Sequence, residues 1–201
     1  MMNGRLILSL FFGLLASPLS SEKLSVDALS EYLNGLRTLQ ASFTQISADS
    51  SLSTGSLYIK RPGRMRFEYD PPNNALVLAA GGQLAIFDPR GNSEPESYPL
   101  SKTPLSLILA DNLNLSQDRM VAAHEYDGTS TILTVQDPDF PDRGFISLVF
   151  TGPQPQLRQW VIQDQNGDQT VVVLNDMTTQ LSLSENLFNI FINKQKRNSK
   201  D

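Results

Sequence analysis

The sequence predicts a mainly β fold, in which an antiparallel meander of roughly ten or eleven strands curls into a barrel or sandwich. Short segments with strand-like patterns recur at regular spacing along the chain, and turn signals rich in Gly, Pro and Asn separate them. Strands do not alternate with long helices, as they would in a parallel sheet. Two or three short helical segments remain, and we expect these to cover the sheet.

The first 21 residues have the pattern of a secretory signal peptide. Arg5 gives a positive start, residues 6–15 form a short apolar run, and Pro18 ends it before small residues. The run is too short for a stable membrane anchor, and no later stretch has the length and apolar character to span a bilayer. We therefore expect an exported, soluble protein whose single domain covers residues 22–193. A buried N-terminal helix is the alternative.

A first helix is predicted to begin at Ser25 and to end near residues 35–38. Ser25 suits the N-cap position and Asp27 suits the positive first turn. Apolar residues follow at helical spacing: Val26, Leu29, Tyr32, Leu33 and Leu36. The helix therefore has one apolar stripe that must be buried against another element. From residue 40 to residue 46 the period changes to two, which predicts the first strand.

The stretch from residue 55 to residue 72 predicts two neighbouring strands, which the turn signal Pro62-Gly63 joins. Side chains alternate along a strand, so each arm presents one face to each side of the sheet. The apolar face carries Leu57 and Ile59 in the first arm and Met65, Phe67 and Tyr69 in the second. Charged side chains occupy the opposite face of the second arm.

Arg61 is the exception, because it shares the face of Leu57 and Ile59. A guanidinium on the apolar side of a sheet needs hydrogen-bond partners, since unpaired buried donors are costly. We interpret Arg61 as a cation that serves an apolar cavity and its cover. A side chain that reaches solvent from the end of a strand is the alternative.

The remaining strands are expected at 75–80, 84–87, 121–126, 131–136, 145–150, 156–163 and 170–174. Asn166-Gly167 is the strongest hairpin signal in the chain. Residues 90–97 are polar and are expected to form a loop. A last apolar patch at 181–192 precedes the basic residues 194–201, which we expect to be a solvated, disordered tail. Docking of this tail on anionic headgroups is the alternative.

A second helix is predicted to begin at Thr103-Pro104, because Thr suits the N-cap and Pro the first helical position. Residues 105–110 are apolar almost all round, so this short helix must lie against an apolar surface. It interrupts the series of strands midway, as an inserted cover would. A plain core helix is the alternative.

The composition argues against several classes of function. A formal net charge of −5 disfavours a nucleic-acid partner. There is no cysteine, and the one histidine, His124, is expected on the surface of a strand. The acidic segments 137–142 and 164–168 have the spacing of turns rather than that of a calcium loop. We therefore expect no enzyme, no metal and no cofactor.

The chain carries more apolar strand surface than one small sheet needs, together with two helices that have apolar faces. A curled sheet under a helical cover encloses an apolar pocket large enough for a lipid. The sequence itself therefore indicates a covered apolar pocket of lipid size.

Several segments together resemble one known family. They are Phe43 with Gln45, Gly55 followed by YIKRPGRMRFEY, the pair ALVLAAGGQLAIFDP, TPLSLILADN, and the hairpin LRQWVIQDQNGDQTVVVL. With these segments in this order, the chain resembles the outer-membrane lipoprotein carrier protein family, LolA, over essentially the whole mature length. The resemblance implies an unclosed barrel whose concave side is covered by helices.

It also implies a monomeric periplasmic carrier that takes triacylated lipoproteins from an inner-membrane lipoprotein-releasing ABC transporter to an outer-membrane acceptor lipoprotein similar to LolB. The arginine that latches the cover falls on Arg61, and the family's cavity residues fall on Met65 and Phe67. With the apolar faces described above, the expected acyl-binding set is Leu57, Ile59, Met65, Phe67, Tyr69, Val77, Ile86, Leu105, Ile108, Leu109 and Trp160.

Three other functions remain as alternatives. An acceptor similar to LolB is disfavoured, because no cysteine is present to carry a lipid anchor. A periplasmic binder of glycolipids or fatty acids could use the same fold. A lipid hydrolase would need a nucleophile with a partner base, and the sequence offers none.

Overall fold

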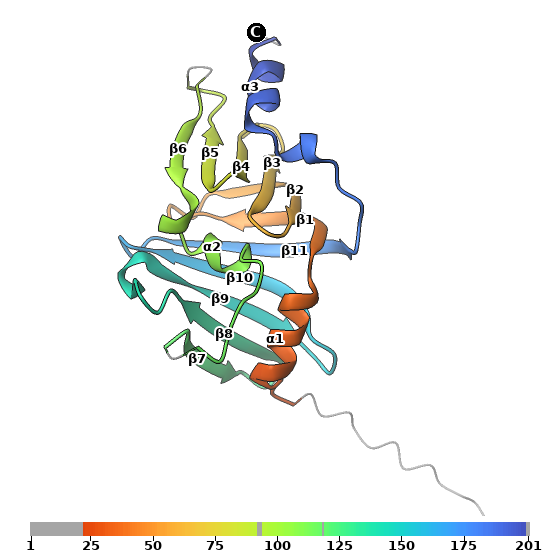
Figure 1. Ribbon diagram of the computed structural model, residues 1–201, viewed down its shortest axis with the longest axis vertical. Coiled ribbons are helices and arrows are strands. Elements are labelled where there is room, and N and C mark those ends of the chain that lie inside the picture. The colour runs from red at the N-terminus through yellow and green to blue at the C-terminus, as the bar shows by residue number, and fades with distance from the viewer. Residues whose placement is uncertain (1–21, 92–93, 118, 200–201) are drawn as a thin grey trace, which may run out of the picture.

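The computed structural model describes residues 22–91, 94–117 and 119–199 (Figure 1). The expected signal peptide lies outside the described residues. Eleven strands form one antiparallel sheet in the order β6-β5-β4-β3-β2-β1-β11-β10-β9-β8-β7. The end strands β6 and β7 are not paired with each other, so the barrel is unclosed. The mainly β, antiparallel fold that the sequence predicts is confirmed.

The strands are β1 Thr38–Ile46, β2 Leu52–Lys60, β3 Arg64–Tyr69, β4 Leu76–Ala80, β5 Gln83–Phe87, β6 Glu96–Pro99, β7 Val121–Tyr126, β8 Ser130–Gln136, β9 Gly144–Thr151, β10 Gln156–Asp164 and β11 Gln169–Thr179. The α-helices are α1 Val26–Gly35, α2 Leu105–Ile108 and α3 Ile190–Asn198, and the 3-10 turns are η1 Leu100–Lys102, η2 Pro141–Arg143 and η3 Glu185–Phe188. Among the described residues, no helix combines the length and the apolar character needed to cross a membrane.

The strand β1 joins two halves of the sheet, since it pairs with β2 on one side and with β11 on the other. Gly55 on β2 allows the tightest packing in this region. A Cβ at this position would lie 2.1 Å from the backbone oxygen of Glu68 and 2.8 Å from the ring of Phe43. A glycine is therefore required where this aromatic ring lies over the strand.

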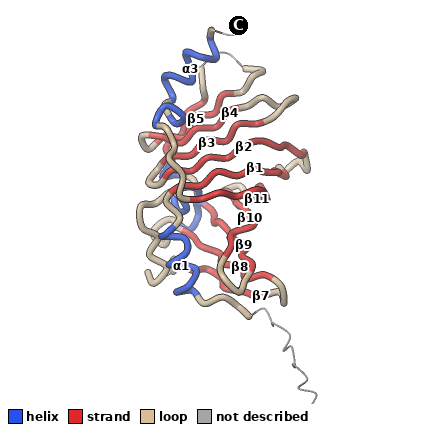
Figure 2. The backbone as a smooth tube through the Cα atoms, turned by 90° about the vertical axis from the view of Figure 1, so that its right-hand side faces the viewer, coloured by secondary structure: helices blue, strands red, loops and turns tan. Residues whose placement is uncertain are grey.

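One face of the sheet carries the main core, and α1 and α2 lie over it (Figures 1 and 2). Leu29 and Leu33 of α1 and Leu107 of α2 belong to the same apolar cluster as the inward residues of the strands. We call this side of the sheet the concave face. We call α1 together with residues 100–113 the cover.

The opposite face of β4 and β5 carries a second, smaller cluster of Leu76, Leu78, Ala85 and Phe87, against which Ile190 of α3 packs. Consequently these strands are buried on both faces, which explains why residues 75–80 form a continuous apolar run.

The C-terminal segment is where the structure differs from the sequence prediction. Residues 194–198 belong to α3 rather than to a disordered tail. The Asn189 side chain accepts from the backbone N–H of Ile192 and caps the helix. Lys194 pairs with Glu94 at 2.5 Å, and Arg197 donates to the carbonyl of Asn74 at 3.0 Å. Packing and these polar contacts therefore order a helix that is polar by composition.

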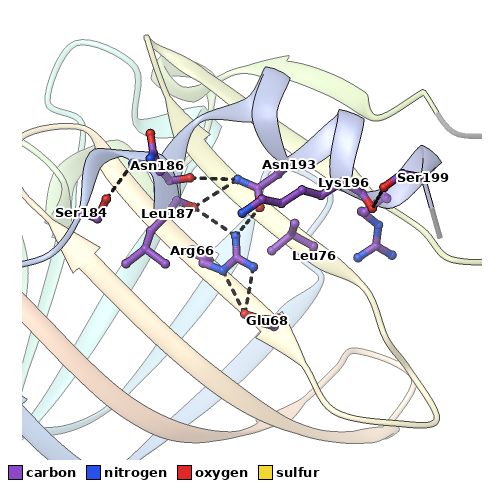
Figure 3. A pocket seen from close by; sticks show the side chains of 10 residues that line it. Arg66, Glu68, Leu76, Ser184, Asn186, Leu187, Asn193, Lys196 and Ser199 are labelled. Carbon is purple, nitrogen blue, oxygen red and sulfur yellow. Dashed lines mark hydrogen bonds and ion pairs between the residues drawn. The ribbon is translucent and has the colours of Figure 1, made fainter.

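Arg66 of β3 fastens this segment to the sheet (Figure 3). Arg66 is 8% exposed, and its Nη1 donates to the carbonyl of Leu187 at 3.0 Å and to Oδ1 of Asn193 at 2.9 Å. Nε and Nη2 both donate to Glu68. The sequence predicts only that the charged side chains of this arm share one face, and it does not predict these partners.

Two smaller differences concern local elements. Part of the expected loop at 90–97 belongs to β6, an exposed edge strand with little apolar pattern. The helix predicted over 103–110 is a single turn, α2, and η1 precedes it. The N-cap position of α2 is Pro104 rather than Thr103, and the Thr103 hydroxyl donates to the carbonyl of Leu100.

Candidate functional site

Arg61 lies at the junction of three segments. It follows the last residue of β2 and is 7% exposed. Its Nε donates to the carbonyl of Ala110 at 2.7 Å, and its Nη1 donates to the carbonyls of Leu33 and, at 3.5 Å, of Leu36. One guanidinium therefore contacts the end of α1 and the residues that follow α2. The last carbonyls of a helix lack internal partners and favour a cation.

The turn after β2 positions this side chain. Strand alternation directs Arg61 to the concave face, and Gly63 takes a φ of +70°, which favours glycine. The backbone of the turn is also bonded to the cover. The N–H of Arg61 donates to the carbonyl of Arg37 at 2.8 Å, and the N–H of Gly63 donates to the carbonyl of Leu109 at 2.8 Å.

Asn34 of α1 and Arg37, which follows the end of this helix, bind the residues after α2 directly. The Asn34 amide donates to the carbonyl of Leu113 at 3.1 Å and accepts from the N–H of Leu113 at 2.8 Å. Arg37 donates to the carbonyl and the carboxylate of Asp111, at 2.8 and 2.6 Å. These two residues could not be identified from the sequence, because polar groups at the end of a helix give no signal of which groups they will contact. The two parts of the cover are thus joined to each other.

The electrostatics of Arg61 follow from its burial. Burial lowers the pKa of its guanidinium, the nearby Arg37 cation lowers it further, and the Asp111 carboxylate opposes both effects. An arginine nevertheless remains charged at neutral pH. Its Nη2 is buried without an acceptor among the described residues. The guanidinium therefore uses Nε and Nη1 in these hydrogen bonds and leaves Nη2 unused.

The residues expected to bind acyl chains lie on the concave face. Leu57, Met65 and Trp160 are 0% exposed, and Ile59 and Phe67 are 4% and 5% exposed. All five belong to the main core cluster. In this structure they form part of one buried cluster beneath the cover, and none of them is more than 5% exposed. Their role in binding stays a prediction.

The other members of the expected set surround this group. Val77 is the cross-strand partner of Phe67, and Ile86 is the partner of Val77, so these two extend the same row toward the edge of the sheet. Both are partly exposed. The residues of the cover are Leu105 and Ile108, which are partly buried, and Leu109, which is 1% exposed.

Aromatic rings form the centre of the concave face. The ring centroid of Phe43 lies 4.9 Å from that of Phe67 and 5.1 Å from that of Tyr69, in perpendicular arrangements. The Tyr69 hydroxyl donates to Oε1 of Gln45 at 2.7 Å. Burial raises the pKa of Tyr69 to about 12, and the hydrogen bond to Gln45 partly opposes this shift.

The histidine and the acidic turn residues that the sequence singled out make hydrogen bonds that hold the local structure. His124 is half-buried on β7, and its Nε2 lies 2.9 Å from the carbonyl of Leu24. It therefore holds the segment before α1, whereas the sequence prediction placed it on the surface. Asp137 and Asp164 accept hydrogen bonds from backbone N–H groups of their own turns. Within the described ranges, no three acidic or histidine side chains are grouped as metal ligands.

A separate cavity of about 440 Å³ lies under α3, on the side of β3 that faces away from the acyl-binding set. Its lining includes Arg66, Glu68, Leu76, Asn193, Lys196 and Arg197 (Figure 3). Because Met65 and Phe67 point to the other face, the sheet separates this cavity from the covered concave face.

Comparison with known proteins identifies the family. The model of the family described as outer membrane lipoprotein carrier protein LolA matches residues 34–191. A relative from Pseudomonas aeruginosa named outer-membrane lipoprotein carrier protein is 26% identical over 196 residues, 92% of this chain and 93% of its own. A relative of the same name from Methylococcus capsulatus is 26% identical over 169 residues, 80% of each chain.

Among solved structures, one described as a LolA superfamily protein from Nitrosomonas europaea covers 83% of this chain and 98% of its own, with a TM-score of 0.43 and 14% identity. The match of the family model extends from the end of α1 into α3 and includes every strand of the sheet. The chain therefore belongs to the outer membrane lipoprotein carrier protein family, LolA.

Proposed function

We propose that this protein is a periplasmic carrier, which binds the acyl chains of lipoproteins released from the inner membrane and delivers them to the outer membrane. Membership of the LolA family and relatives named as lipoprotein carriers support the proposal. The observation that carries it is the buried Arg61, which joins both parts of a cover over a large apolar cluster.

The chemistry of the cargo explains why a carrier is needed. Three acyl chains hold about 45 methylenes, and exposing each to water costs about 0.8 kcal/mol, so the total is on the order of 35 kcal/mol. Free diffusion of such a lipoprotein through water is therefore negligible. A carrier must replace most of this apolar contact and must still release the cargo.

The closed cover supplies the competing state that release requires. When the cover is shut, Leu57, Met65 and Trp160 are buried in one apolar cluster, and Arg61 donates to carbonyls of α1 and of the residues after α2. Opening exchanges these contacts for contacts with acyl chains. Closing restores them, and this gain helps to expel the cargo toward an acceptor. Arg61 is thus a latch, and the residues beneath it form the acyl-binding surface.

The proposal includes partners and location. The cargo is a triacylated lipoprotein, the donor is an inner-membrane lipoprotein-releasing ABC transporter, and the receiver is an outer-membrane lipoprotein acceptor. The protein acts in the periplasm as a monomer after removal of its signal peptide, and it binds without catalysing a reaction.

The test uses inner-membrane vesicles that contain the transporter and a labelled triacylated lipoprotein. With ATP and this protein, the label is expected in the soluble fraction, in a complex of one carrier and one lipoprotein. A control omits the carrier or replaces it with a lipid-free protein of similar size. If the label stays in the vesicles while a known carrier releases it, the proposal is wrong.

Mass spectrometry of lipids that co-purify from a membrane-containing host distinguishes the alternative. Glycolipids or fatty acids bound without any release of lipoprotein would indicate a periplasmic binder of other lipids.

A further inference from the structure

The concave face contains a buried hydrogen-bond donor that has no acceptor. Trp160 on β10 is 0% exposed, and its Nε1 has no partner among the described residues. Its cross-strand neighbours are Leu148 and Val172, both apolar and buried. The ring of Phe67 stands perpendicular to the indole, with centroids 6.3 Å apart.

Such a donor needs an explanation. An indole N–H can only donate, and burying it unpaired costs free energy that a purely apolar side chain would avoid. Contact with the Phe67 ring is weaker than an N–H···O bond. In the part of the chain that the structure describes, the buried side-chain N and O atoms without a partner are Nε1 of Trp160 and Nη2 of Arg61. Both belong to residues at the covered concave face.

We propose that Nε1 of Trp160 is a binding subsite for the neutral carbonyl oxygen of an ester-linked or amide-linked acyl chain. This inference rests on the proposed carrier function and names the group that the site recognises. A long acyl chain carries one carbonyl, at its head, and only methylenes beyond it. A single donor within an apolar surface therefore fixes where the head of one chain lies.

The surroundings of Trp160 select among acyl compounds. Its cross-strand partners Leu148 and Val172 and the adjacent ring of Phe67 carry no charge. Beside these three residues, the carboxylate of a free fatty acid would lose its hydration and gain no charged partner from them. An ester or an amide brings an acceptor without a charge. The subsite therefore favours conjugated acyl chains over free fatty acids and over plain alkyl chains.

The experiment compares two synthetic lipopeptides of equal chain length, one with two ester-linked acyl chains and one with two ether-linked alkyl chains. The ester compound is expected to bind about two- to twelvefold more tightly, which corresponds to one net hydrogen bond. Trp160 is the one tryptophan of the chain, so intrinsic fluorescence reports on this position alone. The ester ligand should shift its emission to longer wavelength than the ether ligand does.

Two variants complete the test. Trp160→Phe removes the N–H and should bind both lipopeptides with equal affinity. Phe150→Leu is the matched control, because Phe150 is also 0% exposed in the core but has no polar atom, and it should keep the preference for the ester. If Trp160→Phe does not fold, the affinity ratio and the emission of the unaltered protein still decide the question.

Equal affinities with identical emission would overturn the inference and leave the carrier proposal standing. Binding of neither lipopeptide would contradict the carrier proposal as well.

Discussion

Replacing Arg61 with leucine should separate the loading of cargo from its release. The guanidinium makes two short hydrogen bonds, to the carbonyls of Ala110 and Leu33, and a third at the limit of 3.5 Å to Leu36. A hydrogen bond that involves a charged group contributes about 1.5–3 kcal/mol. The two short bonds therefore hold the cover closed by roughly 3–6 kcal/mol.

Losing about 3 kcal/mol shifts the balance between closed and open cover by about 100-fold. The global stability should change much less, because leucine also removes the desolvation cost of a buried charge. Arg61→Leu is therefore expected to melt near the temperature of the unaltered protein and to load lipoprotein from vesicles. It should transfer that lipoprotein to acceptor membranes far more slowly, because closing the cover no longer regains the latch bonds.

Hydrogen exchange measured by mass spectrometry provides the structural readout. Amides of residues 105–113 should exchange faster in Arg61→Leu, while those of the central strands should not. Arg61→Lys is the matched variant, and it should fall between the two, because an ammonium cannot span both carbonyls as the planar guanidinium does. Transfer at the normal rate, despite faster exchange in the cover, would refute the reasoning.

The remaining predictions concern the fold around the site. Gly55→Ala should destabilise the protein by about 2 kcal/mol or more in chemical denaturation, because the added Cβ would lie 2.1 Å from a backbone oxygen. Gly35→Ala is the control and should be nearly neutral, because a Cβ at Gly35 meets nothing within 4 Å. Similar denaturation midpoints for the two variants would contradict this packing. Asn34→Ala should speed amide exchange at Leu113 but not in β9, since it removes both bonds to that backbone; unchanged exchange would show that Asn34 does not hold the cover. Burial raises the pKa of Tyr69 to about 12, so the stability that its neutral form contributes is complete below pH about 10 and is lost as the pH rises through about 12. The free energy of unfolding should therefore fall with pH across this range. Tyr69→Phe should lack this dependence on pH.

Much of the sheet could be predicted from local pattern. Alternation and turn signals placed most strands within a few residues of their observed bounds, because a half-buried strand must repeat its apolar residues with period two. The same alternation assigned Arg61 to the apolar face. The edge strand β6 escaped detection, since all four of its residues are exposed and no apolar pattern marks it.

The partners within the site could not be predicted in the same way. Arg61 binds the backbone carbonyls of Leu33 and Ala110, and every residue has such a carbonyl, so no side-chain pattern identifies them. The order of α3 likewise depends on Ile190 and Arg197 meeting β4, β5 and the turn at Asn74, which are distant in the chain.

The amino-acid sequence by itself determined the mainly β class, the positions of the turns and the face on which each strand residue lies. These properties follow from steric and hydrophobic constraints between near neighbours. Only the tertiary structure decided that the cover is closed, that its two parts are bound to each other, and that the indole N–H of Trp160 is buried without an acceptor. Those features arise where segments far apart in the chain exclude water together, and burial of that kind exists only after the whole sheet has formed.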